Sequence, residues 1–352
     1  MTPETFQERI LAAGRERRPL RIRGGGSKDF YGNMLQGEIL DTGSYAGVIA
    51  YEPAELVLTA RGGTKLAEIE QTLDQQGQML AFEPPHFGQG ATLGGCIATG
   101  LSGPRRASAG AARDFVLGAK IVDGRGRQLR FGGQVMKNVA GYDVSRLLAG
   151  SLGTLGLIVE VSLKVLPKPA QEMTLRLELP EAKAIEQFNR WAGQPLPISA
   201  SAWRDGELHV RLSGAQSGVR GAARKLGGDT VPAAEADKFW TALREHKDAY
   251  FEGDAPLWRL SVPANALPIA LRGEQFHEWG GALRWLRSDA DAEGIRAAAA
   301  RAGGHATLFR SRDKAAGAFA PLPPLLARLH KDLKKVFDPD GILNPGRMYA
   351  EI

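Results

Sequence analysis

The sequence of 352 residues has a single cysteine, Cys96, and no long apolar run. One cysteine excludes an internal disulfide and any metal cluster held by several thiolates of this chain, and it fits a reducing compartment. The N-terminal segment lacks the apolar core of a secretion signal, and no segment approaches the roughly 20 apolar residues of a spanning helix. We therefore expect a cytoplasmic protein, and any contact with the inner membrane would be peripheral.

Two familiar nucleotide-binding patterns are also missing. Neither G-x-G-x-x-G at the start of a helix nor G-x-x-x-x-G-K-[ST] occurs, so the sequence does not support a Rossmann or a P-loop site. The 45 basic and 39 acidic residues are interleaved along the chain and form no basic arm. This distribution argues against binding to nucleic acid.

Glycine is abundant and unevenly placed. Of the 44 glycines, 27 precede residue 171, and many fall in three segments at 24–32, 88–103 and 150–158. A backbone without Cβ atoms can bring several N–H groups close to an anion, so these segments predict a site for a phosphate-bearing ligand. Tight turns and close strand packing are the structural alternative for the same glycines.

Hydrophobic periodicity predicts the surrounding elements. In the first half we expect strands in 19–26 and 55–63, a helix in 64–77, a hairpin from 116 to 131 and a long strand over 157–166. Pro167 and Pro169 then mark a domain boundary. Beyond it, strands alternate with helical segments, which predicts an antiparallel sheet with helices on one face.

Five segments in order resemble a known family of flavoproteins. They are RGGGSKDFYG, EPPHFGQGATLGGCIATGLSG, ARDFVLGAKIVDGRGRQLRFGG, KNVAGYDVSRLLAGSLGTLGLIVEVSLKVLPKP and FDPDGILNPGRM. Their order resembles the vanillyl-alcohol-oxidase, or PCMH-type, family of FAD-binding proteins, and in particular the small FAD-binding subunits of bacterial glycolate oxidases. The resemblance covers residues 19–169 and the end of the chain.

The resemblance implies an α+β fold. A PCMH-type FAD-binding domain of two α+β subdomains is expected over residues 1–170. A second α+β cap domain, built on an antiparallel sheet and facing substrate or a partner, is expected over 171–320. A C-terminal helix and tail, 321–352, would return to the FAD-binding domain.

The resemblance also assigns the glycine-rich segments to FAD. The first loop would wrap the pyrophosphate with main-chain amides, the second would lie along the diphosphate and flavin, and the third would approach the flavin or adenine. The implied cofactor-binding residues are Gly24, Gly25, Gly26, Ser27, Lys28, Gly90, Thr92, Gly94, Gly95, Ala98, Thr99, Gly153, Gly156 and Ile158. Family members that tether FAD covalently carry a histidine after the first loop, where this chain has Ser27 and Lys28, so we expect non-covalent FAD.

Catalytic residues are harder to assign. Hydride transfer from a hydroxy acid needs a base for the hydroxyl proton and a cation for the carboxylate. His86 and Arg105 are the candidates. The alternative for His86 is a purely structural role, and the alternative for Arg105 is a solvated position or an ion pair. Related hydroxy-acid dehydrogenases use a paired-histidine metal site that this chain lacks, and we expect no metal.

The expected function is that of the FAD-binding subunit of a glycolate oxidase. The partners would be the large FAD subunit and an iron–sulfur subunit, and the substrate a small 2-hydroxy acid. A stand-alone flavin oxidoreductase and a non-catalytic scaffold are the alternatives. An apolar stripe on the helix predicted near the C-terminus is expected to pack on its own domain; docking to a partner subunit or an anionic membrane is its alternative. The stripe consists of Leu325, Leu326, Leu329, Leu333 and Val336.

Overall fold

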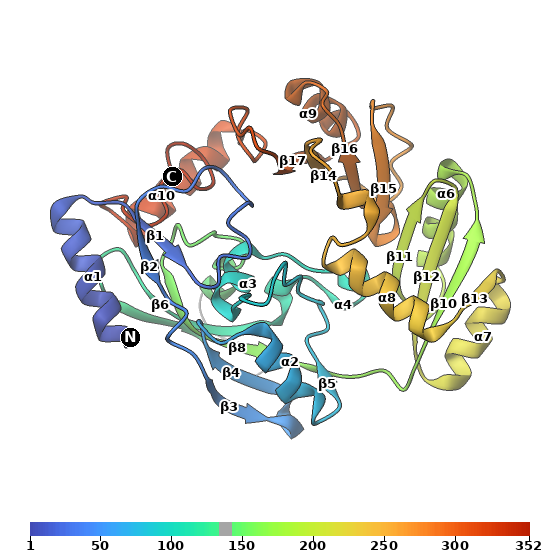
Figure 1. Ribbon diagram of the computed structural model, residues 1–352, viewed down its shortest axis with the longest axis horizontal. Coiled ribbons are helices and arrows are strands. Elements are labelled where there is room, and N and C mark those ends of the chain that lie inside the picture. Colours follow the sequence, from blue (N-terminus) through green and yellow to red (C-terminus); the bar gives the residue numbers. More distant parts are fainter. Residues whose placement is uncertain (134–142) are drawn as a thin grey trace. The chain divides into compact units, whose positions relative to one another are not determined.

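The computed structural model describes residues 1–133 and 143–352 (Figure 1). They form two compact units. Unit 1 comprises Met1–Leu101, Ala111–Pro167 and Pro321–Ile352, and unit 2 comprises Ser102–Gly110 and Lys168–Ala320. The segment Ser102–Gly110 therefore packs in unit 2 although it lies within the range expected for the FAD-binding domain. Part of the fourth family segment, residues 137–142, lies outside the described residues.

The described part of unit 1 contains three sheets, one of five strands and two of two strands. β1 (Leu20–Arg23) and β2 (Glu38–Asp41) pair in parallel. An antiparallel sheet has the order β3-β4-β8-β6-β7, with strands Val48–Glu52, Val57–Arg61, Leu157–Lys164, Val116–Val122 and Gln128–Gly132. β5 (Gln78–Met79) and β9 (Leu166–Pro167) form a short pair. The helices are α1 (Pro3–Glu16), α2 (Leu66–Asp74), α3 (Leu93–Thr99), α5 (Val144–Leu147) and α10 (Pro324–Phe337).

The predicted hairpin is confirmed as β6 and β7. Its turn is closed by Asp123, whose carboxylate accepts from the main-chain N–H groups of Arg125 and Arg127 at 3.0 and 2.8 Å. Gly126 in this turn has φ +70°, which suits glycine. A short-range sequence signal was sufficient here because every determinant lies within the turn itself.

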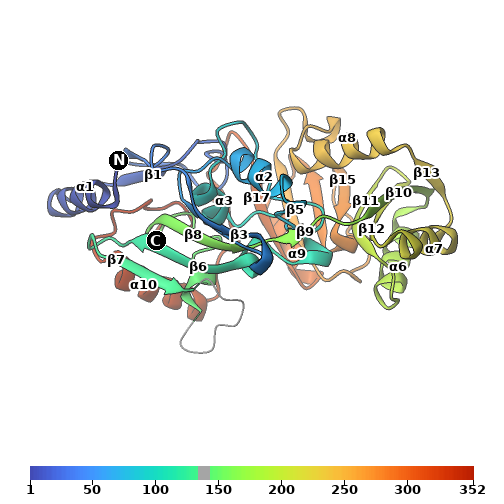
Figure 2. The same cartoon turned by 90° about the horizontal axis from the view of Figure 1, so that it is seen from below.

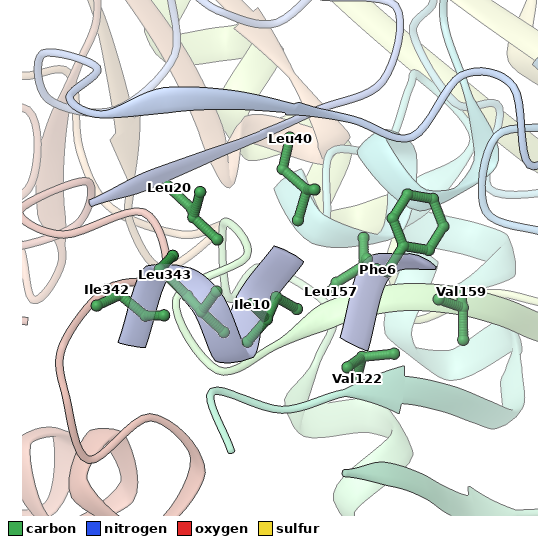
Figure 3. Close-up of a cluster of buried hydrophobic side chains, with 10 residues drawn as sticks. Phe6, Ile10, Leu20, Leu40, Val122, Leu157, Val159, Ile342 and Leu343 are labelled. Atoms are coloured by element: carbon green, nitrogen blue, oxygen red, sulfur yellow. The ribbon is translucent and has the colours of Figure 1, made fainter. Parts of the chain in front are cut away.

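One hydrophobic cluster joins distant parts of unit 1 (Figure 3). Side chains from α1, both parallel strands, the larger sheet and the C-terminal tail meet in it. Its buried members are Phe6, Ile10, Ala13, Leu20, Leu40, Val122, Leu157, Val159, Ile342 and Leu343. Burying such side chains contributes roughly 1.5–3 kcal/mol each, so the cluster fixes the tail and the glycine-bearing strand β1 to the same core.

Most of the apolar stripe of α10 is exposed and does not pack on its own domain, contrary to expectation; Leu333 is half-buried. Leu325, Leu326, Leu329 and Val336 are 69, 44, 49 and 58% exposed. The inner side of α10 instead presents Phe337 and the buried Lys334. Burial of this lysine is possible because its ammonium group donates to two main-chain oxygens, as described below, and the helix is held without its apolar stripe.

Unit 2 contains one antiparallel sheet of eight strands. Their order is β13-β10-β12-β11-β15-β16-β14-β17. The strands are β10 (Gln171–Glu178), β11 (Ile198–Arg204), β12 (Glu207–Gly214), β13 (Asp229–Val231), β14 (Leu257–Ser261), β15 (Glu274–Glu278), β16 (Leu283–Arg287) and β17 (His305–Arg310). The helices are α4 (Arg106–Ala109), α6 (Glu181–Ala192), α7 (Gln216–Leu226), α8 (Ala233–Arg244) and α9 (Ala292–Arg301).

The helices of unit 2 cover both faces of the sheet, not one face as the sequence pattern predicted. Helices α6 and α7 pack on the face that carries Leu208 and Val210. On the opposite face, Phe239 of α8 stacks on His209 with ring centroids 4.2 Å apart, and its neighbour Trp240 donates to Thr174 at 2.9 Å. Figure 2 shows α8 on one side of these strands and α6 and α7 on the other.

A buried group of ionisable side chains lies in unit 2 between α6 and the sheet. His277 on β15 is fully buried, pairs in register with Arg284 on β16, and has its Nε2 atom 3.3 Å from Glu181 Oε1. Burial, with Arg284 as a second cause, lowers the pKa of His277 to about 3. Burial raises the pKa of Glu181 above its ordinary value. Neutral histidine is therefore the form that the folded unit holds.

His277 should make stability fall as the pH is lowered. Between pH 6.5 and about 3, this histidine is protonated in the unfolded chain but stays neutral in the folded protein. The free energy of unfolding therefore drops by up to about 1.4 kcal/mol for each pH unit below 6.5. We expect His277→Gln to flatten the pH slope of stability between pH 7 and 5.5, measured by urea unfolding. The other buried histidines are present in both the wild type and the variant, so the difference in slope between the two proteins reports on His277. An unchanged slope would contradict the assignment.

Candidate functional site

A cleft in unit 1 gathers all three glycine-rich segments. It contains about 740 Å³ of space free of atoms, part of it open to solvent. All but one of the residues expected to contact FAD line it: Gly24, Gly25, Gly26, Ser27, Lys28, Thr92, Gly94, Gly95, Ala98, Thr99, Gly153, Gly156 and Ile158. The exception, Gly90, supports the cleft from behind. Segments more than a hundred residues apart thus share one site.

The three consecutive glycines allow two stretches of main chain to touch. A Cβ atom at Gly25 would overlap the carbonyl oxygen of Gly90, and one at Gly24 would overlap the hydroxyl of Thr92. The first loop therefore lies directly against the second. Neither glycine is explained by the ligand alone, because the missing side chains make room for protein atoms.

The first loop leaves main-chain donors without protein partners. Within the described residues, the N–H groups of Gly24, Gly25, Gly26 and Ser27 donate to no protein acceptor. Consecutive free amides that line a cleft form the kind of concavity that binds anions. The donor set therefore fits a diphosphate.

The net charge of the cleft lining is positive, opposite in sign to that of a diphosphate. The charged lining residues in the described part of the chain are three cations, Arg23, Lys28 and Arg347, and one carboxylate, Asp29. Lys28 is buried and donates to the main-chain oxygen of His86 at 3.2 Å. Burial lowers the pKa of Arg347 to about 10, so its guanidinium remains a cation at neutral pH. The excess of positive charge favours a doubly charged phosphate linker.

The second and third segments are tied together by main-chain hydrogen bonds. Gly150 N–H donates to the carbonyl of Ile97 at 2.9 Å, and Leu152 N–H donates to that of Ala98 at 2.8 Å. Both acceptors belong to α3. Helix α3 and the loop before β8 consequently form one wall of the cleft.

Sequence reasoning missed several lining residues. They are Ile22, Arg23, Asp29, Leu35, Thr42, Leu152, Leu157, Asn344 and Arg347. Most of them adjoin a glycine segment and could have been found from that proximity. Asn344 and Arg347 come from the ILNPGR tail, and only the family pattern signalled that this tail matters.

The two catalytic candidates lie outside the cleft lining. The Nε2 atom of His86 is 3.1 Å from Glu70 Oε2. Arg105 belongs to unit 2, is buried and forms an ion pair of 2.5 Å with Glu172. Neither position tests a catalytic role, and both remain predictions.

Cys96 is buried on α3, as expected for a small apolar residue. Burial raises the pKa of its thiol to about 12. The thiol is therefore protonated at neutral pH, and it does not line the cleft.

Comparison with known proteins shows the class of protein to which this chain belongs. Residues 1–132 match the family model described as FAD binding domain. The chain is 48% identical to glycolate oxidase subunit GlcE of Escherichia coli (strain K12), over 99% of this chain and 98% of that protein. The chain therefore belongs to the family of glycolate oxidase subunit GlcE.

More distant relatives share only part of the chain. Glycolate oxidase subunit GlcD of Bacillus subtilis (strain 168) is 33% identical over 128 residues, which are 36% of this chain and 27% of that protein. The solved structure of an alkyldihydroxyacetonephosphate synthase aligns with a TM-score of 0.66 at 16% identity, covering 96% of this chain and 73% of that one. This likeness shows the α+β fold with its FAD-binding domain and antiparallel sheet.

Gly25→Ala should damage the cleft by forcing the two loops apart. We expect at least a tenfold loss of FAD affinity, measured by flavin fluorescence titration, and about 1–3 kcal/mol of destabilisation from overpacking. Gly221→Ala on α7 is the control, because its Cβ would meet no atom within 4 Å. It should leave FAD affinity unchanged and stabilise the helix by up to about 1 kcal/mol. Equal FAD affinity in both variants would contradict the loop contact.

Proposed function

We propose that this chain is the FAD-binding subunit of a glycolate oxidase that converts glycolate to glyoxylate. The observation that carries the proposal is the cleft of unit 1, where free main-chain amides and an excess of cations meet. Similarity to GlcE along almost the whole chain supports the choice of this oxidase over other flavin enzymes.

The chain's residues would hold the cofactor as follows. The amides of Gly24 to Ser27, which line the cleft, would donate to the pyrophosphate, and Lys28 and Arg347 would neutralise its charge. The apolar lining residues Leu152, Leu157 and Ile158 offer contacts to a ring system. When bound, FAD supplies the acceptor for the electrons of the hydroxy acid.

The cofactor is proposed to be held without a covalent bond. Ser27 and Lys28 stand where tethering family members have histidine, and no histidine, cysteine or tyrosine occurs among the described lining residues. The nearby thiol of Cys96 is kept protonated by burial. The cleft therefore offers no side chain suited to attack the flavin.

Acid precipitation of the purified yellow protein should release the flavin into the supernatant. The expected result follows from the absence of a nucleophile in the cleft lining that the structure describes. Absorbance near the flavin maximum in the supernatant and in the washed pellet measures it. A pellet that stays yellow would overturn the non-covalent assignment.

Among its described lining residues, the cleft offers no unengaged group that could take the substrate's proton. Asp29, the carboxylate among its described lining residues, pairs with Arg21 and at 2.9 Å with Arg23. The single cysteine cannot hold an iron–sulfur cluster, which needs several thiolates. We therefore propose that the large FAD subunit and an iron–sulfur subunit complete the enzyme, in the cytoplasm, with membrane contact only through the complex.

The exposed stripe of α10 is the surface that we assign to a partner subunit. It is bordered on one side by basic residues, Arg328, Lys331 and Lys335, so it fits an apolar groove with an acidic edge. Four of the large exposed apolar side chains of the described chain gather on this one helix. Such concentration is typical of an interaction site.

Leu325→Ser with Leu329→Ser should separate complex formation from FAD binding. We expect reduced co-purification with the co-expressed partner subunits and at least a tenfold loss of glycolate oxidation by the preparation. FAD content should not change, because α10's stripe lies outside the cleft lining. The partners used are the proposed large FAD subunit and iron–sulfur subunit from the same source, and dye reduction by glycolate measures activity.

The wild-type chain without partners is the control. Glycolate oxidation at the rate of the complex would favour a stand-alone oxidoreductase, and absence of bound flavin would favour a scaffold. Undiminished co-purification of the double variant, with lost binding to anionic vesicles, would assign the stripe to a membrane surface instead.

A further inference from the structure

The C-terminal tail supplies part of the cleft wall. Asn344 and Arg347 line the cleft together with residues more than three hundred positions earlier in the chain. The main-chain N–H of Leu20 donates to the carbonyl of Ile342 at 2.7 Å, and Asn344 N–H donates to the carbonyl of Leu20 at 2.9 Å. The tail thus runs alongside β1, which leads into the triple-glycine loop.

The side chain of Asn344 bridges the two walls of the cleft. Its Oδ1 atom accepts from the main-chain N–H of Ile22 at 2.7 Å, and its Nδ2 atom donates to the carbonyl of Leu152 at 2.6 Å. Ile22 stands just before the first glycine loop, and Leu152 just before Gly153. Because one contact needs an acceptor and the other a donor, only an amide of this length satisfies both.

Gly153 is shaped to admit this amide. A Cβ atom at Gly153 would lie 2.7 Å from Asn344 Nδ2, closer than such atoms can approach. Gly153 also has φ +75°, where residues with a side chain are strained. The sequence reading assigned Gly153 to the ligand, whereas the structure gives a second reason for glycine there.

Asn344 is held from the other side by a buried ion pair. Lys334 Nζ donates to the carbonyls of Leu343 and Thr154 at 2.7 and 2.9 Å and lies 2.8 Å from Asp338 Oδ2. Asp338 in turn accepts from the main-chain N–H of Leu343 at 2.7 Å. Leu343 itself is buried beside Leu20 in the core cluster (Figure 3). The residue before Asn344 therefore has little freedom to move.

We propose that Asn344 is a positioning residue of the FAD cleft, whose amide sets the spacing between the triple-glycine loop and the loop that contains Gly153. This inference rests on the proposed FAD site and adds a residue to it. The spacing matters because main-chain donors on the first loop must meet the ligand while the opposite wall contacts it. Without the bridge, each wall still contacts the second segment, but the distance between the two walls is fixed less tightly.

The test compares, in the full chain, Asn344 of the tail with Asn33, an asparagine outside the tail whose side chain donates to it. Asn344→Gly removes the bridge and tolerates the left-handed backbone of this position, φ +43°. The matched control, Asn33→Ala, removes hydrogen bonds of 3.0 and 3.1 Å to the tail carbonyls of Gly346 and Met348. Asn33 does not line the cleft, and its hydrogen bonds with Arg347 are made by its main chain, which the substitution keeps. We expect the FAD dissociation constant to rise at least tenfold in Asn344→Gly and less than threefold in Asn33→Ala, by fluorescence titration of protein freed of flavin.

Amide hydrogen exchange in the flavin-free proteins supplies the second measurement. Exchange over residues 150–156 should quicken in Asn344→Gly and not in Asn33→Ala. Gly153→Ala, which displaces the amide instead of deleting it, should raise the dissociation constant as Asn344→Gly does. Equal FAD affinities in Asn344→Gly and the wild type would overturn the proposal, as would equal losses in both asparagine variants, which would indicate tail docking alone. A wild-type chain that binds no FAD would instead refute the proposed function.

Discussion

The cleft depends on direct contact between two stretches of main chain, Gly25 against Gly90. Because neither residue carries a side chain, the first loop can lie against the second, and its amides are left without acceptors in the part of the protein that the structure describes. The same missing atoms therefore do two things: they bring distant segments together and they leave donors for a ligand. Lys28 and Arg347 could neutralise a diphosphate only if this contact first forms the cavity that they line.

Much of the fold follows from local patterns in the sequence. The β6–β7 hairpin needed only Asp123 and the glycine of its turn, and alternation along several strands predicted that unit 2 has an antiparallel sheet, though not its eight strands or their order. The sequence pattern did not predict which part of the protein covers a given face of a helix or sheet. Helix α10 is amphipathic, yet its inner side is held by Lys334 through carbonyls of residues 154 and 343, contacts that no local periodicity encodes.

For the candidate site, the sequence predicted which segments take part but not the role of each residue. Glycine-rich composition and the family pattern identified all three segments, and the structure brings them to one cleft. The structural reason for each glycine could not be predicted, because a sequence does not distinguish a glycine that lies against a ligand from one that lies against other protein atoms. Gly153 and Gly25 each face protein atoms, and the partner of Gly153, Asn344, lies in a tail whose contribution to the wall depends on the core around Leu343.

The distribution of ionisable groups agrees with a subunit that holds a cofactor and shares the chemistry. In the described cleft, Asp29 is engaged by arginines, so cations dominate and proton acceptors are occupied. One strongly perturbed histidine of unit 2, His277, is fully buried beside Glu181 and Arg284, where it influences stability and has no access to solvent. Perturbed pKa values mark active sites only when the group can reach a reactant. In this chain the cleft and His277 belong to different units. The base for the hydroxy acid is therefore to be sought on the proposed partner subunits.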